Sequence, residues 1–554
     1  MNHTSPPKLI SNAVHSNPAV HASLYAGYTA SGAWQNQTLA HHAERCAAAH
    51  PDRPVVTDDT GSLSFADALA QAHQLAAALT MHGLRQGEVL SMLLPNWREA
   101  VVINLACALA GFVCNPIVPI YRDAELRFIL QRARSRMVFL AENFRGLNHL
   151  DVIRRLRTDL PDLLQVISVR SRASDCLHYG DLFNLPANVS STTSQIAVGT
   201  IDANAIKLLL YTSGTTGEPK GVLHSHNTLS AELAAVRGFW GLGAGDVFLM
   251  PSPVTHISGY LYALELPFYS GMHSVLMERW DADAAIDLIE RHRISATVGA
   301  TPFLTELLNA AERRAVSLPS LRLFACGGAS VPPELVLRAL VLLPGCQTCR
   351  IYGSSEAPTI TLGVARGDPP ERVALTDGVI VNHEVWVVDP DTGASLGLGQ
   401  EGEILTRGPE LMLGYTESTF NQEAFDAQGF FRTGDLGTLD ARGYITITGR
   451  KKDLIIRGGE NISPREIEEL LLRHPAIADV AVVAMPHPRM AETPCAFVVP
   501  RPGHTITLDD VGAFLEAQRL ARQKFPEALW LVDELPRTPS GKVQKNVLRE
   551  RLKA

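Results

Sequence analysis

Residues Tyr211 to His226 read YTSGTTGEPKGVLHSH, a stretch in which glycine and hydroxyl side chains surround a single lysine. The apolar run AIKLLL precedes it and predicts a buried strand, whereas the following NTLSAELAAV fits a helix. The stretch is therefore expected at the carboxyl end of a strand, where open α/β sheets bind their ligands. This order of elements favours an α/β fold.

The composition of the stretch indicates a loop that binds phosphate. Glycines allow backbone N–H groups to point toward one anion, and the hydroxyl side chains add further donors. The spacing differs from the GxxxxGK[ST] pattern of Walker loops, and a Gly/Pro-rich surface turn is the alternative interpretation. The predicted phosphate-binding residues are Thr212, Ser213, Gly214, Thr215, Thr216, Gly217 and Lys220.

Strand-like and helical runs alternate on both sides of this loop. Upstream, VCNPIVPI, DAELRFILQRA and SRMVFLAE follow one another, and downstream GMHSVLME precedes AAIDLIERHR. Such alternation predicts βαβ units and mostly parallel or mixed sheets covered by helices. After about residue 380, short runs such as EGEILTRGP and GYITITGR predict a small β-rich subdomain. We therefore expect a large N-terminal domain over residues 1–450, with its β-rich part at about 380–450.

A second, smaller α+β domain is predicted for residues 451–554, with the boundary at Lys451–Asp453. Its first helix is expected to begin after Ser463, where Pro464 and Glu466 complete a predicted capping box. The runs DVAVVAMP and ETPCAFVVP then predict strands, and DDVGAFLEAQRLARQKF predicts a helix.

Composition and charge exclude several classes of protein. The 554 residues carry a net charge of −8 and no dense Lys/Arg block, so neither nucleic acid nor anionic lipid is an expected partner. Asparagines and a proline interrupt the apolar run from Ala100 to Ile120. We expect a buried helix that turns at Gly111 into a strand there, and no integral membrane association.

The eight cysteines lack the spacing of a disulfide framework, which favours a reducing cytoplasm. Cys346 and Cys349 form a CxxC, but no second pair lies nearby and the residues that follow resemble a strand, so a metal or redox site is not expected. The N-terminal residues contain neither a basic nor an apolar region, and a secretory signal is not expected either.

Two later loops also follow strand-like runs. LFACGGASV contains Gly327 and Gly328, and CRIYGSSEAPTIT contains Gly353, Ser355 and Glu356. Small residues let a flat ligand approach the backbone, and a carboxylate beside hydroxyls suits a phosphate-bound Mg²⁺. The alternative interpretation of Glu356 is an acid at a helix N-terminus.

Isolated charged residues mark the remaining candidate positions. Asp435 lies in the glycine turn FRTGDLG and could accept ribose hydroxyls, while Arg450 ends GYITITGR and could contact ribose or phosphate. Each could instead be a turn cap or a surface charge. Lys542 follows the Pro/Ser/Gly loop in LPRTPSGK, and an isolated lysine near a chain end is more often solvated than catalytic.

Together, these stretches resemble the adenylate-forming superfamily of acyl-CoA synthetases, luciferases and peptide-synthetase adenylation domains. YTSGTTGEPKGVLHSH, YGSSE, FRTGDLG, GRKKDLIIRGGEN and PRTPSGK occur in that family's order and spacing. The resemblance implies an ATP-dependent carboxylic acid:CoA ligase. Such an enzyme forms an acyl-adenylate and pyrophosphate, then transfers the acyl group to CoA with loss of AMP. ATP, Mg²⁺ and coenzyme A are the implied cofactors.

The resemblance also assigns roles residue by residue. Lys542 matches the lysine of the adenylation step, Lys452 the hinge residue and Glu356 the Mg²⁺ ligand. A small domain that rotates about Lys452 could present one geometry for each half-reaction. The other implied contacts are Ser355 at the nucleotide phosphate, Asp435 at the ribose, Arg450 as a second nucleotide contact, Tyr352, Gly327 and Gly328 at the adenine, and Gly458 and Gly459 in the loop that joins the thioester-forming site.

One segment departs from the family's pattern. MPHPRMAETPCAF has His487 where the family usually carries an acid, and Ala491 where it usually carries glycine. Both positions bear on the contacts expected at the CoA side.

The acyl pocket is expected to begin in PSPVTHISGYLYALELPFYSG, with His256 at the family's usual aromatic or histidine position. No acid lies near the start of this segment, and a buried substrate ammonium would need one, so a non-amino acid is favoured. NPIVPIYR, GVLHSHNTL and SPVTHISGY are most similar to the branch of medium-chain and cyclohexanecarboxylate CoA ligases. A medium-chain, branched or alicyclic acid is therefore favoured, and an aryl acid stays open. The rest of the pocket is expected from Ala300, Thr301, Gly327, Ala357, Pro358, Thr359 and Ile360.

Two other functions stay open at this point. An acyl-AMP ligase would load a separate carrier protein, since the chain ends soon after Lys542 and a fused carrier is not expected. A non-catalytic nucleotide-binding protein is the other alternative, although all the charged candidates are present. The expected partner is a small-molecule carboxylic acid, and the sequence leaves a homodimer open.

Overall fold

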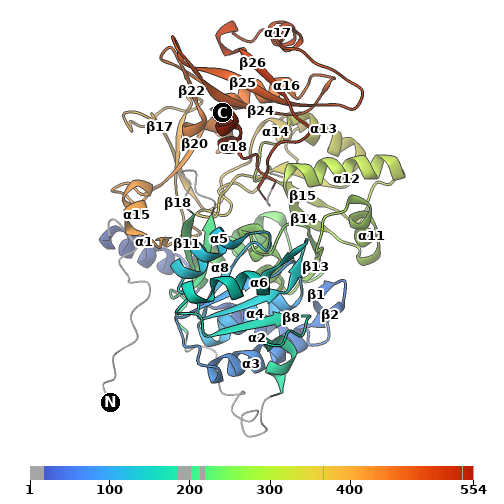
Figure 1. Ribbon diagram of the computed structural model, residues 1–554, viewed down its shortest axis with the longest axis vertical. Helices are drawn as coiled ribbons and strands as arrows, with labels where there is room; N and C mark the ends of the chain where they lie inside the picture. The colour runs from blue at the N-terminus through green and yellow to red at the C-terminus, as the bar shows by residue number, and fades with distance from the viewer. Residues whose placement is uncertain (1–17, 185–200, 213–218, 366, 539–540, 553–554) are drawn as a thin grey trace.

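Two large sheets organise the N-terminal part of the chain (Figure 1). The structure is a computed structural model that describes residues 18–184, 201–212, 219–365, 367–538 and 541–552. All neighbouring strands of the first sheet are parallel except β2, which pairs antiparallel with β1. Its seven strands have the order β16 (Gln347–Arg350), β15 (Leu323–Cys326), β14 (Ala296–Gly299), β12 (Val247–Met250), β13 (His273–Leu276), β1 (Pro54–Asp58) and β2 (Gly61–Ser64).

The second sheet is mixed, because an antiparallel pair, β11 and β19, lies at one edge of a parallel array. Its eight strands have the order β19 (Gly414–Tyr415), β11 (Lys220–Ser225), β10 (Ile206–Thr212), β4 (Val113–Pro116), β3 (Val89–Leu93), β5 (Met137–Ala141), β8 (Gln165–Val169) and β9 (Leu177–His178). The intervening helices include α3 (Phe65–Met81), α5 (Asp123–Arg132), α8 (His226–Trp240), α11 (Ala282–His292), α12 (Thr301–Arg314) and α13 (Pro333–Leu342). The predicted α/β architecture is confirmed.

The long apolar run folds as the sequence predicts. Helix α4 (Glu99–Ala110) is almost wholly buried and ends at Gly111, whose φ of 69° is the left-handed conformation that glycine adopts readily. Strand β4 follows at once. Among the described helices, none is long and apolar enough to cross a bilayer.

The residues after about 380 form the expected antiparallel sheet. Its strands are β17 (Glu384–Val388), β18 (Gly402–Arg407), β20 (Phe431–Leu439) and β21 (Ile445–Arg450). A single 3₁₀ turn, Lys451–Asp453, follows at the predicted domain boundary.

The C-terminal part lies above the larger part in Figure 1. Its buried apolar side chains form two clusters of their own, as a separate domain requires. Its five strands are β22 (Ile455–Arg457), β23 (Glu460–Ile462), β24 (Ile477–His487), β25 (Ala491–Pro500) and β26 (Ala528–Leu531), and its helices are α16 (Pro464–Leu471), α17 (Leu508–Ala517) and α18 (Lys545–Arg551).

Helix α16 starts where predicted, but the predicted capping box is wrong. Pro464 is the first helical residue, as its fixed φ favours. The Ser463 hydroxyl, however, donates a hydrogen bond of 2.7 Å to the backbone carbonyl of Thr448, and Glu466 pairs with Lys524. Ser463 therefore connects the helix start to strand β21 instead of capping its own helix.

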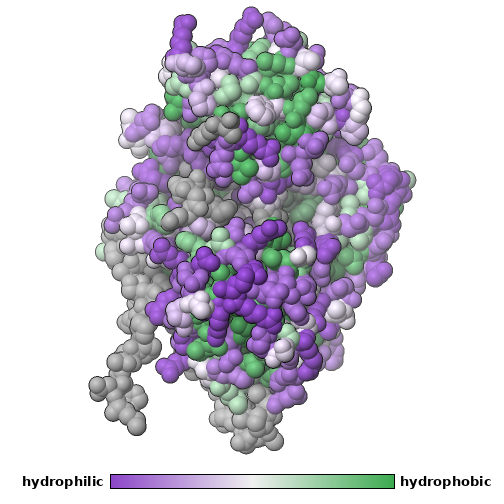
Figure 2. Space-filling view, in the orientation of Figure 1, coloured by the Kyte–Doolittle hydropathy of each residue, from purple (hydrophilic) through white to green (hydrophobic). Residues whose placement is uncertain are grey.

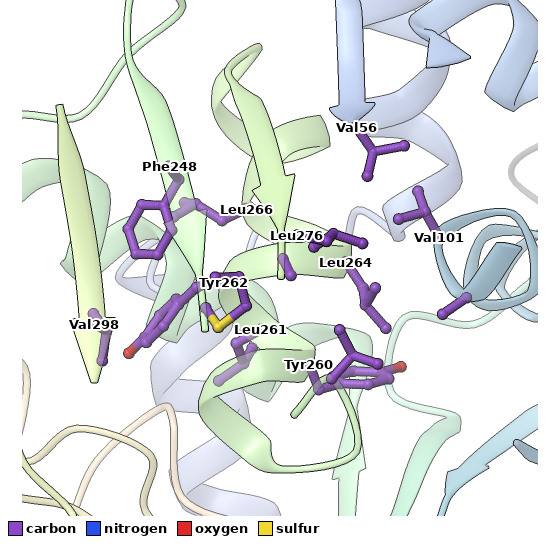
Figure 3. Close-up of a cluster of buried hydrophobic side chains, with 14 of the residues drawn as sticks. Val56, Val101, Phe248, Tyr260, Leu261, Tyr262, Leu264, Leu266, Leu276 and Val298 are labelled. Carbon is purple, nitrogen blue, oxygen red and sulfur yellow. The ribbon is translucent and has the colours of Figure 1, made fainter. Parts of the chain in front are cut away.

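The main core lies around an unusual helical segment (Figure 3). Tyr260–Glu265 forms a π-helix, a rare geometry that often occurs near functional sites. Tyr260 and Tyr262 are fully buried in it, beside Phe248 and Leu276 of the neighbouring strands. The segment continues from His256, so the core fixes the position of the predicted acyl-binding region.

The visible surface (Figure 2) is largely hydrophilic, and the two cysteines of the CxxC are buried. Hydrophilic side chains cover most of the face shown in Figure 2. Cys346 and Cys349 are buried at strand β16, and the described residues contain no cluster of three or more His, Cys, Asp or Glu side chains suited to a metal. The CxxC is part of the core, as predicted.

Candidate active site

The phosphate-loop candidate connects two antiparallel strands. Thr212 at the end of β10 pairs in register with Lys220 at the start of β11. Strand β11 was not predicted, because the residues after the loop fit only a helix by their pattern. That helix, α8, begins later, at His226. The candidates Ser213, Gly214, Thr215, Thr216 and Gly217 lie outside the described residues.

Lys220 is held at this site by aromatic rings. Its Nζ lies 5.1 Å from the ring centroid of Tyr415 and 4.6 Å from that of Phe420. The Tyr415 hydroxyl donates a hydrogen bond of 2.7 Å to Oε1 of Glu356. The predicted phosphate-binding lysine and the predicted metal-binding acid are therefore connected through one tyrosine.

The surroundings of Glu356 fit a magnesium ion. Oε1 of Glu356 accepts the bond from Tyr415. Its Oε2 accepts no hydrogen bond from the part of the chain that the structure describes. Its backbone accepts from Met412 N–H at 2.8 Å, which fixes the loop. One carboxylate beside the hydroxyls of Ser354 and Ser355 is the ligand type that Mg²⁺ prefers, since this ion keeps several of its waters.

Ser355 is fixed by a residue that the sequence did not identify. Nε2 of His224, on β11, donates to the backbone carbonyl of Ser355 at 2.8 Å. Burial lowers the pKa of His224 to about 4, so the ring is neutral at physiological pH. This bond joins the phosphate-loop hairpin to the loop that carries Glu356.

Three residues of the predicted nucleotide site, from separate segments, are hydrogen-bonded to one another. The Tyr352 hydroxyl donates to Oδ2 of Asp435 at 2.8 Å, and Nε of Arg450 donates to Oδ1 at 2.7 Å. Asp435 and Arg450 face each other across β20 and β21, and the carboxylate raises the pKa of the guanidinium. A carboxylate has about four lone-pair positions, so Asp435 can still accept from ribose hydroxyls.

Close packing explains two of the predicted glycines. A Cβ on Gly353 would lie 2.0 Å from the carbonyl oxygen of Pro358, and one on Gly327 would lie 2.6 Å from that of Ile351. Neither position can hold a side chain without moving the backbone. Gly328 adopts a φ of 81°, a conformation that other residues avoid.

Lys542 reaches this site from the C-terminal part. A Cβ on the preceding Gly541 would lie 3.6 Å from Cβ of Ala300, so the lysine loop rests on a predicted pocket residue. Burial lowers the pKa of Lys542 and Arg450 lowers it further, while Asp435 and Glu356 oppose this shift. Lys542 therefore lies close enough to Arg450, Asp435 and Glu356 for their charges to act on its ammonium.

His256 lies within electrostatic range of Lys542. Burial, with a smaller effect of Lys542, lowers the pKa of His256 to about 4. Its Nε2 atom is buried and has no hydrogen-bond partner among the described residues. An orphaned nitrogen beside the lysine is suited to a polar atom of a bound ligand, because a buried polar group without a partner is costly.

The C-terminal part is positioned by polar contacts with the large part. Arg473 pairs with Glu334 of α13 at 2.8 Å, and Ser330 donates to Glu469 at 3.3 Å. Lys452, the predicted hinge residue, is exposed on the 3₁₀ turn. The Gly458–Gly459 pair is exposed at the tip of the β22–β23 hairpin, with φ angles of 60° and 92°. In this arrangement Lys542, and not the glycine pair, reaches the residues around Asp435.

A buried acid that the sequence analysis did not identify supports the wall of the predicted acyl pocket. Oε1 of Glu232, on α8, accepts from the Tyr262 hydroxyl at 2.7 Å and from the Thr359 hydroxyl. Its Oε2 and both carboxylate oxygens of Glu410 are buried without hydrogen-bond partners among the described residues. Burial raises the pKa of Glu232 to about 7, and Glu232 adds to the raised pKa of Glu410.

We expect Glu232→Gln to stabilise the protein at alkaline pH. An acid whose pKa is raised on folding stabilises the native state below its unfolded pKa, and this contribution is lost as pH rises through the folded pKa. The loss for Glu232 should therefore occur between its ordinary pKa of 4.5 and about 7. Denaturant unfolding should show a gain for the variant of about 3 kcal/mol at pH 8, and less than about 1 kcal/mol at pH 5.

The exposed Glu44→Gln variant is the matched control and should show no such difference between the two pH values. An equal gain for Glu232→Gln at both pH values would contradict the assignment.

The comparisons with known proteins agree with this geometry. Residues 43–416 match the family model described as AMP-binding enzyme, and residues 466–542 match the AMP-binding enzyme C-terminal domain. The medium-chain fatty-acid–CoA ligase of Escherichia coli (strain K12) is 38% identical over 95% of this chain and 92% of its own length. A 3-[(3aS,4S,7aS)-7a-methyl-1,5-dioxo-octahydro-1H-inden-4-yl]propanoyl:CoA ligase of Rhodococcus jostii (strain RHA1) is 32% identical over 92% of this chain and 98% of its own length.

A solved structure shows the same fold. The crystal structure of ATP-bound MatB from Rhodopseudomonas palustris superposes with a TM-score of 0.80 and 29% identity, and the match covers 93% of this chain and 99% of that one. The predicted boundary at Lys451–Asp453 falls between the two matched family models. Because the first of these models matches more than half of the residues, the chain belongs to the AMP-binding enzyme family.

Proposed function

We propose that the protein is an AMP-forming carboxylic acid:CoA ligase. In its first step a carboxylate attacks the α-phosphate of ATP and releases pyrophosphate, and in its second CoA displaces AMP to give an acyl-CoA. The position of Lys542 carries this proposal, because a residue near the C-terminus reaches the groups around Asp435, Arg450 and Glu356. The similarity to two CoA ligases supports the same chemistry.

The first step brings two anions together, which explains the charged residues at the site. A cation near the α-phosphate stabilises the charge that accumulates there, and Lys542 is the residue placed to supply it. Glu356 is the residue that would hold Mg²⁺, which would neutralise charge on the phosphates when bound. Asp435 and Tyr352 would hold the ribose side of the nucleotide.

The proposed substrate is a medium-chain, branched or alicyclic acid. The predicted pocket residues Ala300, Ala357 and Ile360 are buried, small or apolar side chains. Glu232, which accepts a hydrogen bond from Thr359 of this wall, is fully buried, and burial raises its pKa, which disfavours the negative charge that a substrate ammonium would need. The names of the two ligase relatives, one medium-chain and one alicyclic, point to the same class.

A panel of acids tests the substrate class. Purified protein is mixed with ATP, Mg²⁺, CoA and medium-chain, alicyclic, aryl and long-chain acids, and the products are identified by mass. We expect the highest turnover with medium-chain, branched or alicyclic acids. Activity only with aromatic or long-chain acids would contradict this assignment, and acyl-AMP without thioester would instead indicate a carrier protein as acceptor.

Two further expectations accompany the proposal. All eight cysteines are free thiols, which supports the predicted reducing cytoplasm. A homodimer stays a prediction, which light scattering of the purified protein checks.

A further inference from the structure

The turn between β24 and β25 is organised by a histidine that the family pattern does not contain. Nδ1 of His487 accepts hydrogen bonds from the backbone N–H groups of Arg489, at 3.2 Å, and Met490, at 3.0 Å. Two backbone donors on one nitrogen require that this nitrogen carries no proton. The imidazole therefore acts as the acceptor that closes the turn, in place of the carboxylate oxygen of an acid.

Glu527 faces the other nitrogen of this ring. Its Oε2 lies 3.8 Å from Nε2 of His487, and its Oε1 pairs with Arg457 of strand β22. A carboxylate near Nε2 favours the tautomer with its proton on Nε2 and leaves Nδ1 free to accept. Glu527 thereby connects the turn to the strand that leads to Gly458.

The closed 487–491 turn also holds the Gly458–Gly459 loop in place. The carbonyl of Met490 accepts from Gly458 N–H at 2.8 Å, and Oε2 of Glu492 accepts from Ile456 N–H at 2.8 Å. A Cβ on Gly458 would lie 2.6 Å from Cε of Met490, so the two segments are in close contact. The position of the glycine loop thus depends on the conformation of the turn.

The turn also contains a residue in an unfavourable conformation. Ala491 has a φ of 64°, the left-handed region that costs a non-glycine residue about 1 kcal/mol or more. Such a conformation persists only where surrounding contacts fix it. The two hydrogen bonds to Nδ1 of His487 lie within the same turn and help to fix this conformation.

We propose that His487, oriented by Glu527, is a positioning residue for the thioester-forming step. It holds the 487–491 turn, which places the Gly458–Gly459 loop where the second half-reaction uses it. This inference rests on the proposed function, because the loop takes part in thioester formation only if the protein is the CoA ligase that the family resemblance implies. Lys542 lies in a different segment, so the adenylation step does not depend on the turn.

Separate assays of the two half-reactions test the proposal. His487→Ala should form acyl-adenylate at the wild-type rate. This step is measured as pyrophosphate release in the absence of CoA. Conversion of supplied acyl-adenylate by CoA should slow roughly tenfold to a hundredfold, the size expected when a reacting group is misplaced. His487→Asp supplies an oxygen acceptor for the same two N–H groups and should restore most of the lost rate. The matched control is His504→Ala, an exposed histidine of the same domain.

Three results would overturn the inference. These are a His487→Ala variant with a normal second step, one with both steps slowed equally, and a failure of His487→Asp to recover the rate. A wild-type protein that cannot convert acyl-adenylate with CoA contradicts the proposed function itself, and the inference with it. The two failures are therefore distinguishable.

Discussion

Lys542→Ala should slow adenylate formation by roughly a hundredfold to a thousandfold, the loss typical when one group that stabilises transition-state charge is removed. In the structure the charges of Arg450, Asp435 and Glu356 act on the pKa of the Lys542 ammonium. Pyrophosphate release in single-turnover mixtures of enzyme, ATP and acid measures the effect.

The second half-reaction provides the internal comparison for this variant. Thioester formation from supplied acyl-adenylate should be affected far less, because the α-phosphate has by then lost pyrophosphate. Lys524→Ala, which removes a surface ion pair with Glu466 in the same domain, should leave both steps unchanged. Equal slowing of the two steps by Lys542→Ala would refute the assigned role.

Asp435→Ala should raise the KM for ATP by about a hundredfold or more. The variant removes the acceptor for ribose hydroxyls and also releases Tyr352 and Arg450 from their hydrogen bonds. Hydrogen bonds to charged groups contribute about 1.5–3 kcal/mol each. The loss of two such bonds to the ribose hydroxyls therefore accounts for an effect of this size. Initial rates over a range of ATP concentrations measure it.

Asp391→Ala, an exposed acid of the same β-rich segment, is the control and should keep the wild-type KM. The KM for the carboxylic acid should change little in either variant, since the hydrogen bonds of Asp435 in the described part of the chain join Tyr352, Thr433 and Arg450, which are not predicted acyl-pocket residues. An unchanged KM for ATP in Asp435→Ala would place the nucleotide elsewhere.

Short-range patterns explain which parts of the fold the sequence could predict. The burial of α4 and its end at Gly111 follow from an apolar run and one glycine, and the start of α16 follows from Pro464. Both depend on residues adjacent in the chain. The capping box failed because the Ser463 hydroxyl found a partner in β21, and such a long-range competitor leaves no local signal.

The candidate active site likewise contains residues that the sequence could predict and residues that it could not. Family motifs predicted Asp435, Arg450 and Tyr352 one by one, and the fold brings them together. The contacts of His224 with Ser355 and of Glu232 with Thr359 join segments more than a hundred residues apart, whereas the unpredicted strand β11 pairs with β10, which is close to it in the chain. A histidine or glutamate in an amphipathic stretch looks the same whether it is solvated or buried, so no spacing rule could identify these two.

The most direct test of the account is the nucleotide product of the complete reaction. Purified protein with ATP, Mg²⁺, CoA and the best acid of the panel should yield AMP and acyl-CoA in equal amounts, and AMP should not form when the acid is omitted. Acid-dependent formation of ADP with phosphate, or of acyl-CoA without AMP, would contradict the adenylate route and with it the roles given to Lys542 and Asp435.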